Sequence, residues 1–509
     1  MQRAVLLKKQ PPFARRYGIL LPLFSLPGPY GIGTLGKQAF LFVDFLARAG
    51  AAYWQLLPLG PTGYGDSPYQ SFSSFAGNPY FIDPELLYRQ GKLTKAELQT
   101  AQAEPGEINY FKLYQTREAL LYRAFLRAQK KDLPGYDEFL WQNRDWLTNY
   151  AEYTALKRHF GEKGRIALPY PVKTAEAEAF VKQRLKKQTA FVCYEQYEFF
   201  AQFCALKSYA ESKGVQFIGD LPLYTANDSA DVWANPELFC LNQNGSPSAV
   251  AGVPPDEFSK TGQLWGNPLY NWPAHESTGF SWWCSRVARQ FSLYHILRID
   301  HFIGISRYYA IPANAQNAQN AQNGKWLPGP DKALIAALQK AVPNGRYIAE
   351  DLGLLNPKTA ALIQKTGFPG MRLLQSAFNS GSSNGNLPHR LPKNCVLYTG
   401  THDNNTLQGR ILSFTPAEKR YAYRYLGVKR RANLQPRLIR AGFAATPDLF
   451  ILPLQDLLGL GASARINTPA TLGQNWRWRL TELPPNLLAD ETAALAAIFE
   501  RSNFNDSEH

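Results

Sequence analysis

Arg298 and Asp300 stand two residues apart in the largely apolar segment Leu297–Phe302. Successive side chains of a strand point to opposite faces, so a strand here places the guanidinium and the carboxylate on one face. A neighbouring cation lowers the pKa of a carboxyl group and keeps it ionised, which suits a nucleophile. The same pair is also typical of a buried structural ion pair, and the spacing alone leaves both interpretations open.

Glu350 ends a second apolar run and is followed directly by Asp351. Two adjacent carboxylates repel each other, and burial raises the pKa of one of them. A glutamic acid with a raised pKa can act as a general acid near neutral pH. The alternative is a helix N-terminus, where the helix dipole favours acidic residues.

His402 and Asp403 belong to a polar cluster at a third predicted strand end, residues 398–406. Burying so many polar groups is costly unless each has a partner, and a ligand rich in hydroxyl groups would supply partners. A metal site formed by His301, His402 and the acids is the alternative. The two histidines do not show the spacing of a helical zinc motif, and we expect no metal.

Aromatic residues are frequent, with 11 Trp and 27 Tyr, and several lie in predicted loops. Their rings offer flat apolar faces with a polar edge, which suits the C–H faces and hydroxyl edges of sugars, although core packing explains some of them. The loop aromatics are Tyr64, Tyr69, Trp233, Trp265, Trp272 and Trp326. Acids on separate strands together with such loops indicate glycoside chemistry, in which carboxyl groups about 5–5.5 Å apart give a retaining reaction.

Eight short β-type runs could position these residues, and helical patterns separate most of them. Strands that alternate with helices indicate a parallel sheet, and eight are what a (β/α)8 barrel needs. The runs are Ile19–Pro22, Tyr53–Pro58, Val215–Asp220, Ile296–His301, Tyr347–Asp351, Met371–Gln375, Val396–Thr401 and Leu449–Pro453. We therefore predict the α/β class, with residues 1–509 forming a single catalytic TIM-type barrel.

Two intervals are too long for simple crossovers: residues 60–214, mostly helical in pattern, and residues 224–283, rich in Pro, Gly, Asn and Trp. Long loops in compact domains are usually functional or disordered. We expect a helical subdomain and a Trp- and Pro-rich active-site subdomain, both inserted on the C-terminal face of the barrel. Residues 313–323 are a low-complexity repeat of Ala, Asn and Gln, expected to form a mobile surface loop that buries nothing.

The composition excludes several classes of protein. Apolar residues are 45% and charged residues 19%, as in ordinary globular proteins, and no apolar stretch reaches the ~18 residues of a membrane span. The net charge of +15 raises the prospect of nucleic-acid binding, but no nucleic-acid motif accompanies the basic runs 182–187 and 429–440. The five cysteines are widely spaced and form no C-x-x-C pair, which favours a reducing cytoplasm.

Nine strings spread along the sequence resemble those of one known family. They are SLPGPYGIG (25–33), YGDSPYQ (64–70), GDLP (219–222), DSADVW (228–233), AGVPPD (251–256), WGNPLY (265–270), RIDHF (298–302), AEDLG (349–353) and GTHDN (400–404). In this order they resemble the amylomaltases or disproportionating enzymes, the 4-α-glucanotransferases of glycoside hydrolase family 77. The resemblance runs from Gly18 to Arg479.

The resemblance implies that Asp300 is the nucleophile, Glu350 the general acid/base and Asp403 the transition-state stabiliser. The implied reaction transfers a segment of an α-1,4-glucan to the 4-OH of an acceptor glucan or glucose, without metal or organic cofactor. Tyr64 is implied in a second glucan site. The implied substrate contacts are Ser67, Tyr69, Asp220, Gln263, Trp265, Arg298, His402 and Asn467.

Four positions depart from the family pattern, and none removes a catalytic acid. Ile303 stands where arginine is usual, Asn405 where aspartate is usual, Asn379–Ser380 where an acidic pair is usual, and Ala470 where glycine is common. Two other functions compete with the transferase. An α-amylase-type hydrolase would use the same acids with water as acceptor, whereas a non-catalytic glucan-binding protein would not need all three acids.

Overall fold

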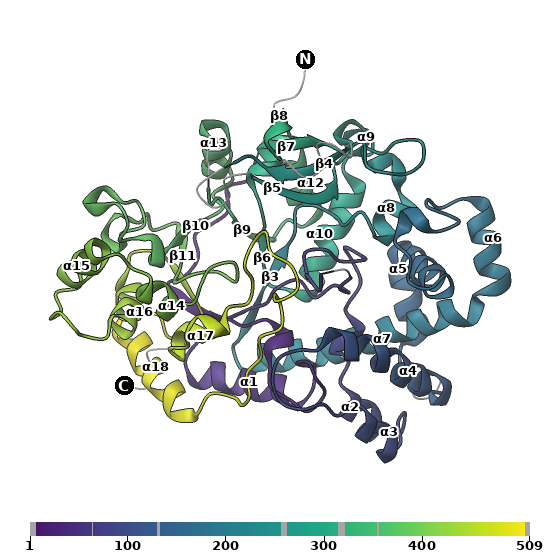
Figure 1. The fold of residues 1–509 in the computed structure, drawn as a ribbon, viewed down its shortest axis with the longest axis horizontal. Helices are drawn as coiled ribbons and strands as arrows, with labels where there is room; N and C mark the ends of the chain where they lie inside the picture. The colour runs from purple at the N-terminus through teal and green to yellow at the C-terminus, as the bar shows by residue number, and fades with distance from the viewer. Residues whose placement is uncertain are drawn as a thin grey trace.

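A computed structural model describes residues 7–63, 65–129, 133–255, 262–313, 321–353 and 356–503. Its centre is an eight-stranded parallel sheet in the order β10-β11-β12-β1-β2-β3-β6-β9 (Figure 1). The strands are β1 (Arg16–Leu20), β2 (Tyr53–Gln55), β3 (Gln216–Leu221), β6 (Ile296–Ile299), β9 (Arg346–Ala349), β10 (Gly370–Leu373), β11 (Cys395–Tyr398) and β12 (Leu449–Pro453). Each coincides with one of the eight predicted runs to within a few residues, so the predicted barrel is confirmed.

The sheet is a nearly closed barrel whose seam lies between β9 and β10. One backbone hydrogen bond crosses the seam, from the amide N of Ala349 to the carbonyl O of Pro369 (2.9 Å). Apolar side chains fill the interior, among them Ile296, Ile348 and Met371. Because side chains alternate along a strand, Arg298 and Asp300 follow Ile296 to the inside, and Glu350 follows Ile348.

Helices cover the outside of the barrel, most of them between successive strands and two of them after the last strand. Many begin at a side-chain cap: Asn356 Oδ1, for example, accepts from the Thr359 amide at the start of α13. These helices are α1 (Lys37–Arg48), α10 (Ser281–Leu293), α11 (Ile303–Ser306), α12 (Asp331–Ala341), α13 (Pro357–Thr366), α14 (Leu407–Leu412), α15 (Pro416–Tyr425), α16 (Leu434–Ala444), α17 (Leu454–Leu457) and α18 (Asn486–Ile498).

The long connection between β2 and β3 is helical. It carries α2 (Pro84–Arg89), α3 (Lys95–Thr100), α4 (Tyr110–Arg127), α5 (Tyr136–His159), α6 (Ala175–Arg184) and α7 (Lys186–Ser212). In Figure 1 the group extends to the right, with α6 farthest from the barrel. Helices α5, α6 and α7 share a separate apolar core that includes Tyr153, Leu156 and Val192 and also buries Trp233 of the next helix along the chain.

A second, antiparallel sheet was not predicted. It has the order β5-β4-β7-β8 and consists of β4 (Ala249–Val253), β5 (Gln263–Pro268), β7 (Arg307–Pro312) and β8 (Lys325–Pro328). The interval 224–283, which holds β4 and β5, also carries the short helices α8 (Ala230–Ala234) and α9 (Trp272–Ser277). The local pattern of β4 is weak because its residues are small, and its pairing with β7 joins distant parts of the chain.

The low-complexity segment is described only at its ends, since residues 314–320 lie outside the described residues. Ala321 is 3% exposed and packs with Val250, Tyr309 and Ile311, and its carbonyl O accepts from the Tyr309 hydroxyl (2.9 Å). The expectation that nothing in this segment is buried is therefore wrong at Ala321, because a methyl group is small enough to fit against these side chains.

Candidate active site

One arginine lies between two carboxylates at the C-terminal ends of β3 and β6. Arg298 Nη1 contacts Asp220 Oδ1 (2.6 Å) and Oδ2 (2.7 Å), and also Asp300 Oδ1 (2.9 Å). Burial alone would lower the pKa of Arg298, but the two carboxylates outweigh it and raise that pKa well above its usual value. The Asp220 side chain is fully buried whereas that of Asp300 is 29% exposed, so Asp300 is the carboxylate that a substrate can reach.

Glu350 lies directly after β9 and is held by two backbone amides. The N–H of His301 donates to its Oε2 (2.9 Å), and that of Leu352 donates to its Oε1 (2.8 Å). Burial, followed by the charge of Asp300, raises the pKa of Glu350 to about 8, although Arg298 opposes the shift. Glu350 is thus protonated near neutral pH, and it precedes α13 by several residues rather than standing at a helix N-terminus.

His301 connects these acids to the aromatic loops. Its φ of +49° turns its amide toward Glu350. Its ring packs edge-on against the Trp265 ring, with the ring centroids 4.8 Å apart. Burial lowers the pKa of His301 to about 4, so the ring is neutral. Trp265 is oriented in turn by Gln263, whose Oε1 accepts from the indole Nε1 (3.1 Å).

Asp403 is 45% exposed and is held from a neighbouring loop. Asn467 Nδ2 donates to Asp403 Oδ1 (2.6 Å), and His402 Nε2 lies 3.4 Å from the same oxygen. The His402 ring stacks on Tyr69 with centroids 5.1 Å apart. The Tyr69 hydroxyl donates to Asp220 Oδ2 (2.8 Å), and its amide donates to Ser67 Oγ (3.2 Å).

These contacts form one network from Glu350 through His301, Asp300, Arg298, Asp220, Tyr69 and His402 to Asp403 and Asn467. The structure therefore brings together the described residues of the predicted site. Tyr64 lies outside the described residues. Within the described ranges, no group of three or more His, Cys, Asp or Glu is arranged to hold a metal ion.

Three neighbours of the site were missed by the sequence analysis: Tyr224, Met371 and Trp476. Tyr224 packs on Trp265 and His301, Met371 Sδ accepts from Arg298 Nε (3.3 Å), and Trp476 lies beside Tyr69 and His402. For Met371 the strand alternation was a usable signal. Conversely, Trp233 and Trp272 were grouped with loop aromatics suited to sugars, and both are buried in apolar clusters.

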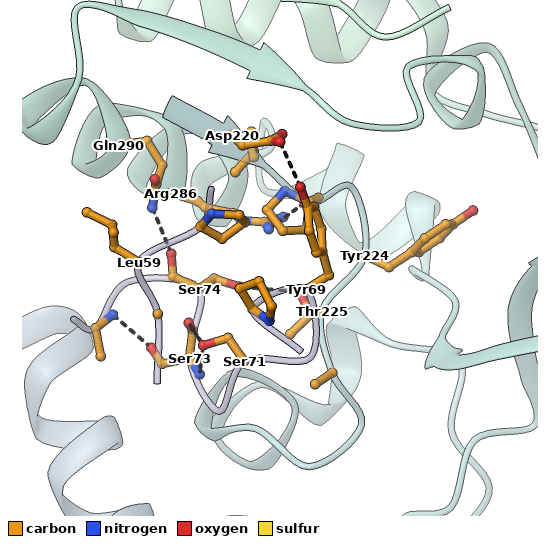
Figure 2. Close-up of a pocket in the computed structure, with 17 residues that line it drawn as sticks. Leu59, Tyr69, Ser71, Ser73, Ser74, Asp220, Tyr224, Thr225, Arg286 and Gln290 are labelled. Carbon is orange, nitrogen blue, oxygen red and sulfur yellow. Dashed lines mark hydrogen bonds between the residues drawn. The ribbon is translucent and has the colours of Figure 1, made fainter. Parts of the chain in front are cut away.

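A small polar cavity lies behind Tyr69 and Asp220 (Figure 2). Its volume is about 40 Å³, close to the ~30 Å³ that one water molecule occupies in the liquid. Figure 2 shows the Tyr69 hydroxyl pointing to Asp220 and the Gln290 amide pointing to the Ser74 carbonyl. Asp300 (29% exposed) and Asp403 (45% exposed) are the carboxylates of the site that a substrate can reach.

Two of the departures from the family pattern lie outside this network. Asn405 turns toward the start of α14, where its Oδ1 accepts from the Thr406 amide (2.9 Å) and its side chain packs against Gly409. Asn379 Oδ1 accepts from Asn384 Nδ2 (2.7 Å). Neither side chain contacts the three acids through a described hydrogen bond.

Replacing Asn467 by alanine is expected to lower the catalytic rate about 10- to 100-fold. A hydrogen bond to a charged group contributes about 1.5–3 kcal/mol, and here its loss frees Asp403 from its orientation. Initial rates of glucan transfer measure the effect. Gln474→Ala, which removes an exposed amide from the same loop, is the control, and equal rates for both variants would contradict the role given to Asn467.

A barrel with a carboxylate–arginine–carboxylate cluster, a buried glutamic acid and stacked aromatic rings at one end is typical of carbohydrate-active enzymes. Comparison with known proteins agrees with this class. The family model of glycoside hydrolase family 77, described as 4-alpha-glucanotransferase, matches residues 21–484. The chain belongs to this family.

Similar proteins cover nearly the whole chain. The 4-alpha-glucanotransferases of Streptococcus pneumoniae serotype 4 and Thermus thermophilus are each 42% identical, with 96% of this chain and 98% of the relative aligned. Among solved structures, amylomaltase from Streptococcus agalactiae in complex with acarbose is 37% identical, with a TM-score of 0.91 over 96% of this chain and all of the other. These relatives confirm the family resemblance on which the residue roles depend.

Proposed function

We propose that this protein is a 4-α-glucanotransferase that acts by a retaining double displacement. The observation that carries the proposal is the network in which Arg298 holds an accessible Asp300 beside Glu350, whose pKa burial raises to about 8. Asp300 attacks the anomeric carbon while Glu350 protonates the glycosidic oxygen, so the glycosidic bond breaks and the shorter glucan leaves. Glu350, now a carboxylate, takes the proton from the 4-OH of an acceptor glucan, which displaces Asp300.

The remaining polar and aromatic residues bind the sugar. Asp403, held by Asn467, accepts hydrogen bonds from sugar hydroxyls and favours the oxocarbenium-like transition state. The donor and acceptor sugars are surrounded by Ser67, Tyr69, Gln263, Trp265 and His402. Asp220 acts on the sugars through Arg298. A second glucan site at Tyr64 rests on the family resemblance alone.

The substrates in this proposal are maltooligosaccharides, amylose, glycogen or starch, and nucleic acid has no part in the reaction. None of the helices in the described ranges has both the length and the apolar character of a membrane span. The five cysteines are free thiols, in keeping with the proposed cytoplasmic location. The proposed setting is the turnover of starch or glycogen.

Incubation with maltotriose separates transfer from hydrolysis. Transfer between glucans conserves the number of reducing ends, whereas each hydrolysis creates one. We expect glucose plus a ladder of longer maltooligosaccharides at nearly constant total reducing ends, measured by chromatography and a reducing-sugar assay. A steady rise in reducing ends without longer products would show a hydrolase instead.

A further inference from the structure

A second cavity, of about 290 Å³, opens on the outer wall of the barrel at the seam between β9 and β10. The C-terminal turn of α13 borders it on one side and the segment before β11 on the other. Side chains alternate along β10, so Met371 points into the barrel and Arg372 points out toward this cavity. None of the three proposed catalytic acids lines it.

Asp351 and Arg372 meet at the inner end of the cavity. Asp351 Oδ1 accepts from the amide N of Met371 (2.6 Å), and Arg372 Nη1 lies 3.2 and 3.1 Å from the two carboxylate oxygens. Nη1 also donates to the Met371 carbonyl. The hydrogen bonds and the ion pair of this guanidinium with described residues all involve Nη1, which leaves Nε and Nη2 of a part-exposed arginine available to a ligand.

Lys9 supplies a second cation to the same cavity. Its stem crosses Gly367, where an added Cβ would lie 2.8 Å from Lys9 Cγ, so the glycine allows this approach. No described residue forms an ion pair with the Lys9 ammonium. Lys9, Arg372 and Asp351 together give the cavity a net charge of one positive.

The helix end beside the cavity is not a cation site. The Thr366 carbonyl already accepts from the Gln10 amide (2.7 Å), and the Gly367 carbonyl accepts from Asn394 Nδ2 (3.0 Å). What remains for a ligand is two cations, the amide of Gln364, and the partly exposed apolar side chains of Ala360 and Ile363.

The volume and the chemistry of the lining define the ligand class. Small-molecule pockets begin at about 300 Å³, so the cavity takes one compact molecule. An arginine fork with a lysine beside it is suited to a phosphate group, and an amide next to small apolar side chains suits the hydroxyl and C–H groups of a sugar. We propose that this cavity binds a small phosphorylated sugar, with the phosphate between Arg372 and Lys9.

The cavity is connected to the proposed active site through the chain. Asp351 directly follows Glu350, and Arg372 directly follows Met371, whose sulfur accepts from Arg298 Nε. A phosphate that draws Arg372 away from Asp351 weakens the ion pair between these two residues, which joins the end of β9 to β10 at the seam. Occupancy of the cavity therefore changes the rate of transfer.

Isothermal titration with glucose 1-phosphate tests the site without any turnover. The full-length Asp300→Asn protein is first saturated with maltoheptaose, so that the active site is filled. Glucose 1-phosphate is expected to bind, and Lys9→Gln, placed in the same protein, is expected to raise its Kd about tenfold. Lys8→Gln removes the same charge from a neighbour that does not line the cavity and should leave the Kd unchanged.

Equal Kd values for the Lys9 and Lys8 variants, or no binding at millimolar concentrations, would overturn the site. Inorganic phosphate that bound as tightly as glucose 1-phosphate would overturn the sugar part of the proposal. In the otherwise unmodified enzyme, glucose 1-phosphate should alter the rate of maltotriose disproportionation, with the effect shifted to higher concentration by Lys9→Gln. Binding without any rate change would refute the connection to Glu350.

Discussion

Replacing Asp300 by asparagine is expected to lower the rate of glucan transfer by at least about 10⁴-fold, because an amide cannot form the glycosyl ester. The fold is expected to remain, since Arg298 keeps its two-oxygen contact with the buried Asp220. Initial rates with maltotriose measure the activity, and circular dichroism melting measures the stability. Near-normal turnover would remove Asp300 from the mechanism.

Azide separates a lost nucleophile from a disturbed site. In Asp300→Gly, azide can enter the space of the missing carboxylate and attack α-glucosyl fluoride from that face, which gives the inverted β-glucosyl azide. In Glu350→Gly, Asp300 is still present and azide instead attacks the glycosyl-enzyme, which gives the retained α-azide. The two variants should therefore yield opposite anomers, distinguished by NMR, and the same anomer from both would contradict the assigned roles.

The barrel and its catalytic strand ends could be predicted from the sequence because their signals are local. Each strand is a short apolar run, and alternation along the run places Asp300 and Glu350 inside once the neighbouring Ile296 and Ile348 are assigned to the core. The choice between a nucleophile and a structural ion pair could not be made locally. It required the exposed fraction of Asp300 and the presence of Asp220 from another strand.

The parts that could not be predicted depend on contacts between distant segments. Asn467 reaches Asp403 across 64 residues, and Trp476 reaches Tyr69 from an irregular segment with no periodicity to read. The small antiparallel sheet has the same origin, since β4 pairs with β7 from a later part of the chain. For Asp220 and Asn467, the family resemblance supplied what residue patterns could not.

Replacing Glu350 by glutamine is expected to lower turnover of maltotriose by about 10²–10⁴-fold, the usual contribution of general acid–base catalysis. α-Glucosyl fluoride needs no protonation of its leaving group, so its first step should persist while the second step, which needs the base, is slow. A covalent glucosyl adduct on Asp300 should then accumulate and be visible by mass spectrometry. Glu276→Gln, an exposed change on α9, is the control and should give no adduct.

The raised pKa of Glu350 predicts one pH effect on the activity of the unmodified enzyme and one on the stability difference between that enzyme and Glu350→Gln. The acid must hold its proton, so kcat/KM of the unmodified enzyme for maltotriose should fall as the pH rises through about 8. With α-glucosyl fluoride this fall in kcat/KM should disappear.

The pKa of Glu350 in the folded state lies above the unfolded value near 4.3, so the folded state binds more protons between the two values. This carboxyl group therefore destabilises the enzyme increasingly as the pH rises to about 8. Glutamine cannot ionise, so the melting temperature of Glu350→Gln should gain on that of the unmodified enzyme between pH 5 and 8. A constant difference between the two melting curves across this range would show that Glu350 is not held protonated by its site.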